Sequence, residues 1–334
     1  MVTPLADRGT LDLAGTERLV EHILAGGVAG LFILGTTGEG PSLSYRLRQE
    51  LVELVAERVA SRVPLLVGIT DTAFEESIAL AEFAADAGAQ AVVLAAPCYY
   101  PATQADLARH VEHLAAESPL PVFLYNMPSH TKLAFEPDTL RRLMEAPNVV
   151  GLKDSSADMI YFHQVRRLAR ARPDWTLLVG PEELLAESVL LGGDGGVCGG
   201  ANLFPRLYVE LYQASHRGDV ERVRDLHDEV LGIAAALYTV ASPGAAVTAG
   251  LKCALSCWGI CGDAMAEPFQ AMTDSQRELI RKRLEGLGSR WVSRRPACPL
   301  CGGALVDIRG KSQCSRCHAI CETCCEGLPE RADG

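Results

Sequence analysis

Residues 148–156 have the sequence NVVGLKDSS, an apolar run with β-branched residues that ends at Lys153 and passes into polar turn residues. This composition predicts a buried strand followed by a turn. A lysine at the end of such a strand cannot extend its ammonium group to water. Its burial costs free energy, so such a lysine is expected to have a function. Desolvation favours the free amine, which attacks carbonyl carbons to form Schiff bases. An acidic partner elsewhere in the chain is the alternative explanation.

Strand-like and helix-like segments alternate on both sides of this run, up to about residue 288. We expect strands at residues 30–34, 63–69, 91–95, 122–125, 149–153, 175–179 and 195–198. Between them, segments such as 45–61, 75–88, 104–118 and 137–146 have the apolar spacing of amphipathic helices. Such alternation predicts an α/β fold with a parallel sheet, and the number of strands favours a (β/α)8 TIM barrel over a doubly wound sheet. Helices at 208–215, 220–240, 244–258 and 275–287 would follow the barrel.

The eighth strand of the predicted barrel should come first in the chain. The sequence instead opens on Met1 and the residues VTP, where that strand would already be ending. We therefore expect that the true start lies upstream of Met1, and a very short first strand is the alternative.

Composition excludes several classes of protein. Hydrophobic residues make up 48% of the 334 residues, enough for a large core, and 42 acidic against 31 basic residues give a net charge of −11. This charge argues against nucleic acid as a partner. No apolar run is long enough to span a membrane, and residues 1–7 lack the features of a signal peptide, so we expect a cytoplasmic protein.

Candidate chemistry gathers where the predicted strands end, because active sites of β/α barrels form at the carboxyl ends of the strands. These ends have the sequences GTTGEG (35–40), APCYYP (96–101), YNMPSHT (125–131), Lys153, GPEE (180–183) and GGVCGGAN (195–202). Small residues such as Gly35 and Gly38 allow backbone N–H groups to approach a carboxylate closely. A tyrosine hydroxyl beside a cationic imine would lose its proton more easily, which suits acid–base work.

In this order, the motifs resemble those of the dihydrodipicolinate synthase and N-acetylneuraminate lyase family, the pyruvate-dependent class I aldolases, over residues 2–285. The resemblance implies that Lys153 forms a Schiff base with pyruvate or another 2-oxo acid and that Tyr125 shuttles protons. It implies further that Thr36 and Thr37, with the backbone at Gly35, hold the carboxylate and that the Val197 carbonyl faces the site. It also implies a hydroxyl relay completed by Tyr99 from a neighbouring subunit, hence a dimer or tetramer, and no catalytic cofactor.

One position departs from the synthases of this family. They carry arginine two residues after the proline of the YNxP turn, whereas this chain has His130, and an imidazole does not replace a guanidinium fork for gripping a carboxylate. Ser155 and Glu183 occupy positions where lyases of sugar acids bind hydroxyl groups, although both would also suit a solvated loop. We therefore expect a Schiff-base lyase that joins or releases pyruvate and an aldehyde, with substrates of the 2-keto-3-deoxy sugar acid, 4-hydroxy-2-oxoglutarate or N-acetylneuraminate type. A 4-hydroxy-tetrahydrodipicolinate synthase, using pyruvate and aspartate semialdehyde, is the alternative.

The domain boundary follows from a change of composition. We expect an aldolase domain over residues 1–288, a linker over 289–297 and a zinc-ribbon-like module over 298–326. Seven of the twelve cysteines lie in the last segment, and Cys298, Cys301, Cys314 and Cys317 form two Cys-x-x-Cys pairs suited to a structural Zn²⁺. Ordinary thiols are expected at Cys321, Cys324 and Cys325, with a second ion, also bound by His318, as the alternative.

The role of this module stays open on the sequence alone. The module is expected to contact a protein partner or to stabilise an oligomer, since its basic and acidic residues nearly balance. Two other classes of function compete with catalysis. One is a non-catalytic barrel that serves as a scaffold for the zinc module, and the other is redox sensing through the cysteines.

Overall fold

The computed structural model describes residues 1–242, 244–287, 305–308, 311–314 and 320–321. The chain divides into two compact units, Met1–Gly288 and Ser289–Gly334. In the second unit, an antiparallel sheet joins β10 (Leu305–Ile308), β11 (Lys311–Cys314) and β12 (Ile320–Cys321). None of the helices in the described ranges combines the length and the apolarity that crossing a membrane requires.

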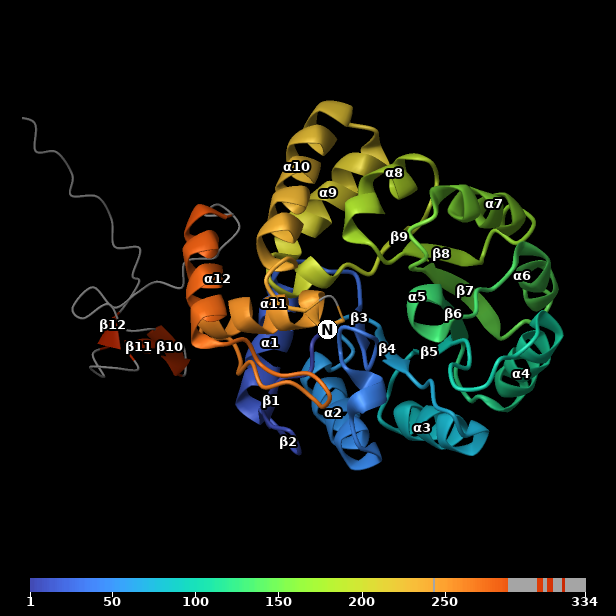
Figure 1. The fold of residues 1–334 in the computed structure, drawn as a ribbon, viewed down its shortest axis with the longest axis horizontal. Coiled ribbons are helices and arrows are strands. Elements are labelled where there is room, and N and C mark those ends of the chain that lie inside the picture. Colours follow the sequence, from blue (N-terminus) through green and yellow to red (C-terminus); the bar gives the residue numbers. More distant parts are fainter. Residues whose placement is uncertain (243, 288–304, 309–310, 315–319, 322–334) are drawn as a thin grey trace, which may run out of the picture. The chain divides into compact units, whose positions relative to one another are not determined.

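A curved parallel sheet of seven strands forms the centre of the first unit, and its strands follow one another in chain order. They are β3 (Leu31–Ile33), β4 (Leu65–Gly68), β5 (Ala91–Ala95), β6 (Val122–Asn126), β7 (Val149–Asp154), β8 (Thr176–Val179) and β9 (Gly195–Gly196). Figure 1 shows them in an arc with helices along its outer side. Parallel neighbours in sequence order require crossover helices, so the predicted α/β architecture with a barrel-like sheet is confirmed.

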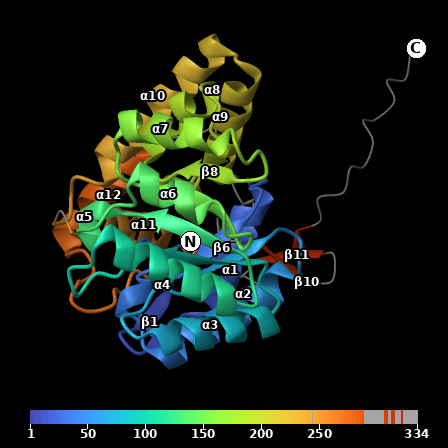
Figure 2. The same cartoon turned by 90° about the vertical axis from the view of Figure 1, so that its right-hand side faces the viewer.

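Helices connect the strands and cover the sheet, as Figures 1 and 2 show from two directions. They are α1 (Leu13–Ala25), α2 (Tyr45–Val59), α3 (Phe74–Asp86), α4 (Gln104–Glu117), α5 (Pro128–Thr131), α6 (Pro137–Leu143), α7 (Met159–Ala169) and α8 (Leu185–Leu190). Helix α4 illustrates how the sequence sets their limits. Thr103 and Asp106 form a capping box at its start, while Leu107, Val111 and Leu114 recur at helical spacing and are buried.

The expected count of eight strands is not reached in the described residues, where the parallel sheet has seven. The first residues of the chain lie beside β3 without forming a strand. The Met1 amino group donates to the Phe32 carbonyl (2.6 Å), and the Thr3 hydroxyl donates to the Gly38 carbonyl (2.6 Å). Residues 1–3 thus contact the edge of the sheet at which an eighth strand would pair. The antiparallel pair β1 (Leu5–Asp7) and β2 (Thr10–Leu11) then leads into α1.

Among the described residues, four helices follow the sheet: α9 (Pro205–Arg217), α10 (Val220–Leu237), α11 (Ala246–Cys257) and α12 (Asp274–Gly286). Helix α11 is buried over most of its length, including Leu251, Lys252 and Cys253. This burial matters for the site below, because α11 and the loop after it reach the turn that follows β3.

Candidate active site

Lys153 lies near the carboxyl end of β7 and is only 9% exposed. Its ammonium nitrogen lies 4.2 Å from the centroid of the Tyr125 ring and 5.1 Å from that of the Phe32 ring. In parallel register, Lys153 pairs with Tyr125 of β6 on one side and with Leu178 of β8 on the other. Adjacent strands thus hold the amine and the phenol at one end of the sheet.

Tyr125 is 6% exposed, and its hydroxyl is 3.2 Å from the hydroxyl of Thr36. Burial raises the pKa of Tyr125, but the cation of Lys153 and hydrogen bonds with Thr36, Ser155 and Lys153 act against it. The net pKa of this phenol lies below the ordinary value. A buried tyrosine beside an amine, with a hydroxyl partner for its proton, can serve as an acid and a base.

The turn after β3 brings two further predicted residues to the amine. Thr36 and Thr37 line a small cavity together with Lys153 and Val197. Gly35 packs so closely against Phe32 that a β-carbon there would lie 2.6 Å from that ring, which explains why the turn begins with glycine. Hydroxyl and backbone N–H groups in this place can bind a small carboxylate.

A larger cavity of ≈ 320 Å³ adjoins this turn. Its walls include Gly35, Thr36 and Tyr125 from the strand ends, and His130 from α5. His130 is exposed, and its ring nitrogen Nδ1 lies 2.9 Å from the Ser129 hydroxyl. Partial desolvation of the ring, followed by the Lys132 cation, lowers the pKa of His130, so this imidazole is a poor substitute for a permanent cation.

Three other predicted residues do not line either cavity. Ser155 follows β7, half-buried, and its hydroxyl is close enough to Tyr125 to influence the pKa of that phenol. Tyr99 is 75% exposed and stacks edge-on against Tyr100, so it does not reach Thr36 or Tyr125 within one chain. Glu183 is half-buried and lines neither of the two cavities described above.

The predicted zinc ligands belong to the second unit. Cys298, Cys301 and Cys317 lie outside the described residues, and for Cys314 only the backbone in β11 is described. Over the part of the chain whose side chains are described, no group of three or more histidine, cysteine or acidic residues is arranged to hold a metal ion. The zinc module therefore stays a prediction.

A sequence profile of the dihydrodipicolinate synthetase family matches residues 1–287. The chain belongs to the dihydrodipicolinate synthetase family. Among curated family members, a 4-hydroxy-tetrahydrodipicolinate synthase of Methanopyrus kandleri is 34% identical over 292 residues, which cover 86% of this chain and 94% of the relative. A protein of Gluconacetobacter diazotrophicus with the same name is 31% identical over 288 residues, which cover 86% of this chain and 95% of the relative.

Solved structures of the dihydrodipicolinate synthetase family are similar to this chain in sequence and in fold. The dihydrodipicolinate synthase of Bacteroides thetaiotaomicron is 51% identical, with a TM-score of 0.84, over 86% of this chain and 96% of that one. A prophage protein of E. coli K12 from the same family, solved in complex with pyruvate, is 28% identical. Its TM-score is 0.81, and the match covers 87% of this chain and 97% of that one. The prediction of a class I aldolase of this family is thereby confirmed.

Several residues of the site had no separate signal in the sequence. Phe32 places its ring against both Lys153 and Tyr125, meeting the latter edge-on at 6.4 Å. Arg48 reaches the larger cavity from α2, where it pairs with Asp71 at 2.9 Å. An apolar residue in a strand and an arginine on a helix are too common to stand out, and only the folded chain shows which surface they face.

Proposed function

We propose that Lys153 forms a Schiff base with pyruvate and that the chain condenses it with aspartate semialdehyde, as a 4-hydroxy-tetrahydrodipicolinate synthase. The Lys153 amine attacks the carbonyl carbon of pyruvate, and water leaves as the imine forms. The observation that carries this proposal is the buried amine beside the Tyr125 phenol, 4.2 Å from its ring, with the Thr36 hydroxyl on that phenol at 3.2 Å. The names of the curated relatives favour aspartate semialdehyde as the second substrate.

In this proposal the iminium acts as the electron sink. Loss of a proton from the pyruvate methyl group gives an enamine, whose carbon attacks the aldehyde carbon while the aldehyde oxygen takes up a proton. Tyr125, relayed by Thr36, is the group that accepts and returns these protons, and its lowered pKa supports this role. Thr36 and Thr37 would hold the carboxylate of pyruvate in the small cavity.

Borohydride reduction in the presence of pyruvate, followed by peptide mass spectrometry, tests the first step. A reduced pyruvate adduct on Lys153 is the expected result. An adduct on another lysine, or none in folded protein, would refute the assignment of Lys153.

His130 favours a second candidate, an aldolase for an aldehyde without a carboxylate. The expected arginine is missing at this position, and Arg48, the guanidinium that lines the larger cavity, already binds Asp71. A panel containing aspartate semialdehyde and hydroxylated sugar aldehydes, each assayed with pyruvate, separates the candidates by kcat/KM. Preference for aspartate semialdehyde supports the synthase, and preference for a hydroxylated aldehyde supports the lyase.

Two further parts of the proposal concern assembly and metal. Tyr99 is exposed on the single chain and would complete the hydroxyl relay of a second copy, so the active form is a homo-oligomer. The residues outside the aldolase unit would bind one structural Zn²⁺ through the two Cys-x-x-Cys pairs, the second of which begins at Cys314, the last residue of β11. Sedimentation tests the oligomer, and metal analysis before and after chelation tests the zinc.

A further inference from the structure

The turn that follows β3 contains a backbone conformation that needs support. Glu39 lies in the left-handed region, with φ of 55° and ψ of 22°. Residues other than glycine adopt this conformation at a cost, and they keep it where surrounding contacts over-determine it. Glu39 also closes the turn, since its N–H donates to the Thr36 carbonyl (3.0 Å) and its carbonyl accepts from the Ser42 N–H (2.9 Å).

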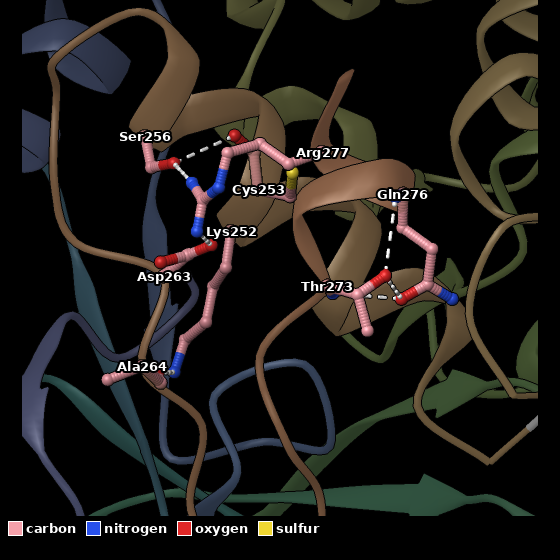
Figure 3. Close-up of polar contacts among 8 residues, drawn as sticks. All are labelled: Lys252, Cys253, Ser256, Asp263, Ala264, Thr273, Gln276 and Arg277. Atoms are coloured by element: carbon pink, nitrogen blue, oxygen red, sulfur yellow. Dashed lines mark hydrogen bonds and ion pairs between the residues drawn. The ribbon is translucent and has the colours of Figure 1, made fainter. Parts of the chain in front are cut away.

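Contacts from the far end of the first unit hold the side chain of Glu39. One carboxylate oxygen accepts the backbone N–H of Ala266 (2.8 Å), and the other forms an ion pair with Lys252. The ammonium group of Lys252 also donates to the Ala264 carbonyl (2.8 Å), as Figure 3 shows. Lys252 is fully buried and Glu39 is 6% exposed, so water does not compete for these contacts.

A buried ion pair is weak evidence for stability, because desolvation of both ions offsets their attraction. Its place in the molecule indicates a different use. Glu39 lines the larger cavity and lies two residues after Thr37, which lines the small cavity beside Lys153. Helix α11 thus reaches the carboxylate-binding turn through one lysine. Burial lowers the pKa of Lys252 while Glu39 opposes this, so the cation depends on its partner.

We propose that Lys252 is a positioning residue for pyruvate, because its ion pair with Glu39 holds the turn of residues 35–40 in the shape that presents Thr36 and Thr37 to the substrate carboxylate. This inference rests on the function proposed above. Lys252 does not touch the substrate and acts only through Glu39. Small displacements of positioning groups have large kinetic effects, so the consequence of losing the pair should appear in pyruvate binding.

The test compares Lys252→Met with the double variant Lys252→Met/Glu39→Gln. The single variant leaves a buried carboxylate without its cation, so its Tm falls and its KM for pyruvate rises about tenfold, with kcat changed less than about threefold. The double variant removes the unpaired charge and regains Tm, but its KM stays raised because the turn has lost its anchor. If KM returns to the wild-type value together with Tm, or never rises, the proposal is wrong. Where the single variant does not fold, KM of the double variant decides.

Arg277→Met is the matched control. Arg277 of α12 forms an ion pair with Asp263 (2.5 Å) and donates to the Ser256 hydroxyl (2.7 Å), next to Lys252 in the same part of the fold (Figure 3). Its loss should lower Tm and leave KM for pyruvate within about twofold of wild type. If wild-type protein forms no pyruvate adduct under borohydride, the proposed function fails. If wild type forms the adduct and Lys252→Met leaves KM unchanged, only the positioning role fails.

Discussion

Two buried lysines of the first unit have opposite surroundings. Lys153, at the end of β7, faces the rings of Tyr125 and Phe32, and no carboxylate among the described residues lies within ion-pair distance of its amine. Lys252, in the middle of α11, is held by the carboxylate of Glu39 and by a backbone carbonyl. Both ammonium groups are removed from water, but only one has a full counter-charge.

Under the proposed function, this difference separates a nucleophile from a structural cation. An amine must shed its proton before it attacks a carbonyl carbon, and a bound carboxylate opposes that loss. Aromatic rings attract a cation more weakly than a carboxylate does, and the neighbouring phenol provides a route for the proton. The partner therefore decides what each lysine can do, even though burial is common to both.

The largest effect is expected from Lys153→Met. Activity and the reducible pyruvate adduct should both be lost, with kcat reduced by about 10³-fold or more, because Lys153 is the buried amine that lies beside the Tyr125 phenol. Stability should hold or rise, since the variant removes a buried charge that has no carboxylate partner. Thermal unfolding and adduct mass spectrometry check the two statements. Lys282→Met, at an exposed position of α12, is the control and should change neither. A marked fall in Tm for Lys153→Met would mean that this lysine supports the fold, as is expected of Lys252.

The next effect concerns the proton route beside Lys153. Tyr125→Phe should lower kcat by about 10²-fold or more, the usual contribution of a positioned acid–base group. Because the pKa of Tyr125 lies below the ordinary value of 10.0, its ionised form appears at lower pH than that of a free tyrosine. The rate of exchange of the pyruvate methyl protons should then rise with pH, with a midpoint below pH 10. In the phenylalanine variant this rise should vanish. A pH profile that survives the substitution would assign the titration to another group.

For Lys252→Met, the main expected effect is a lower free energy of unfolding. Loss of the cation leaves Glu39 buried and unpaired, a change that destabilises folded proteins by about 3–5 kcal/mol. Chemical denaturation measures this difference, and no such destabilisation should appear in Lys153→Met. Equal destabilisation by both substitutions would remove the distinction between the two lysines.

Much of this site follows from local pattern, and one part does not. The strand ends around Lys153, Tyr125 and Thr36 are predictable because apolar runs, turn glycines and strand order are local or sequential features. Lys252 also lies within an apolar stretch, GLKCAL (250–255), so the argument applied to Lys153 applies equally to it. The sequence could not separate the two because the partner, Glu39, lies near the other end of the chain and meets Lys252 only in the folded protein.

The opposite case, a buried carboxyl group without a lysine, is Glu182, which lies in the 3-10 turn Glu182–Leu184 that follows β8. One oxygen accepts the hydroxyls of Tyr208 (2.8 Å) and Tyr238 (2.9 Å), and the other accepts the Gly200 N–H (2.6 Å). Burial raises the pKa of Glu182 above the ordinary value of 4.5, and these hydrogen bonds only partly oppose it. Three neutral donors thus leave part of the desolvation cost of this carboxylate uncompensated.

The smallest effect is therefore expected from Glu182→Gln, and it depends on pH. With a raised pKa, folded protein holds the Glu182 proton more tightly than unfolded protein does. The stabilisation from this proton is complete below pH 4.5 and is lost as pH rises through the folded pKa. Glutamine does not titrate, so over this window the free energy of unfolding should fall less steeply with pH in the variant than in wild type. Unfolding by urea at several pH values measures both slopes, and equal slopes would show that the hydroxyl and N–H donors stabilise an ionised Glu182 as fully as a lysine would.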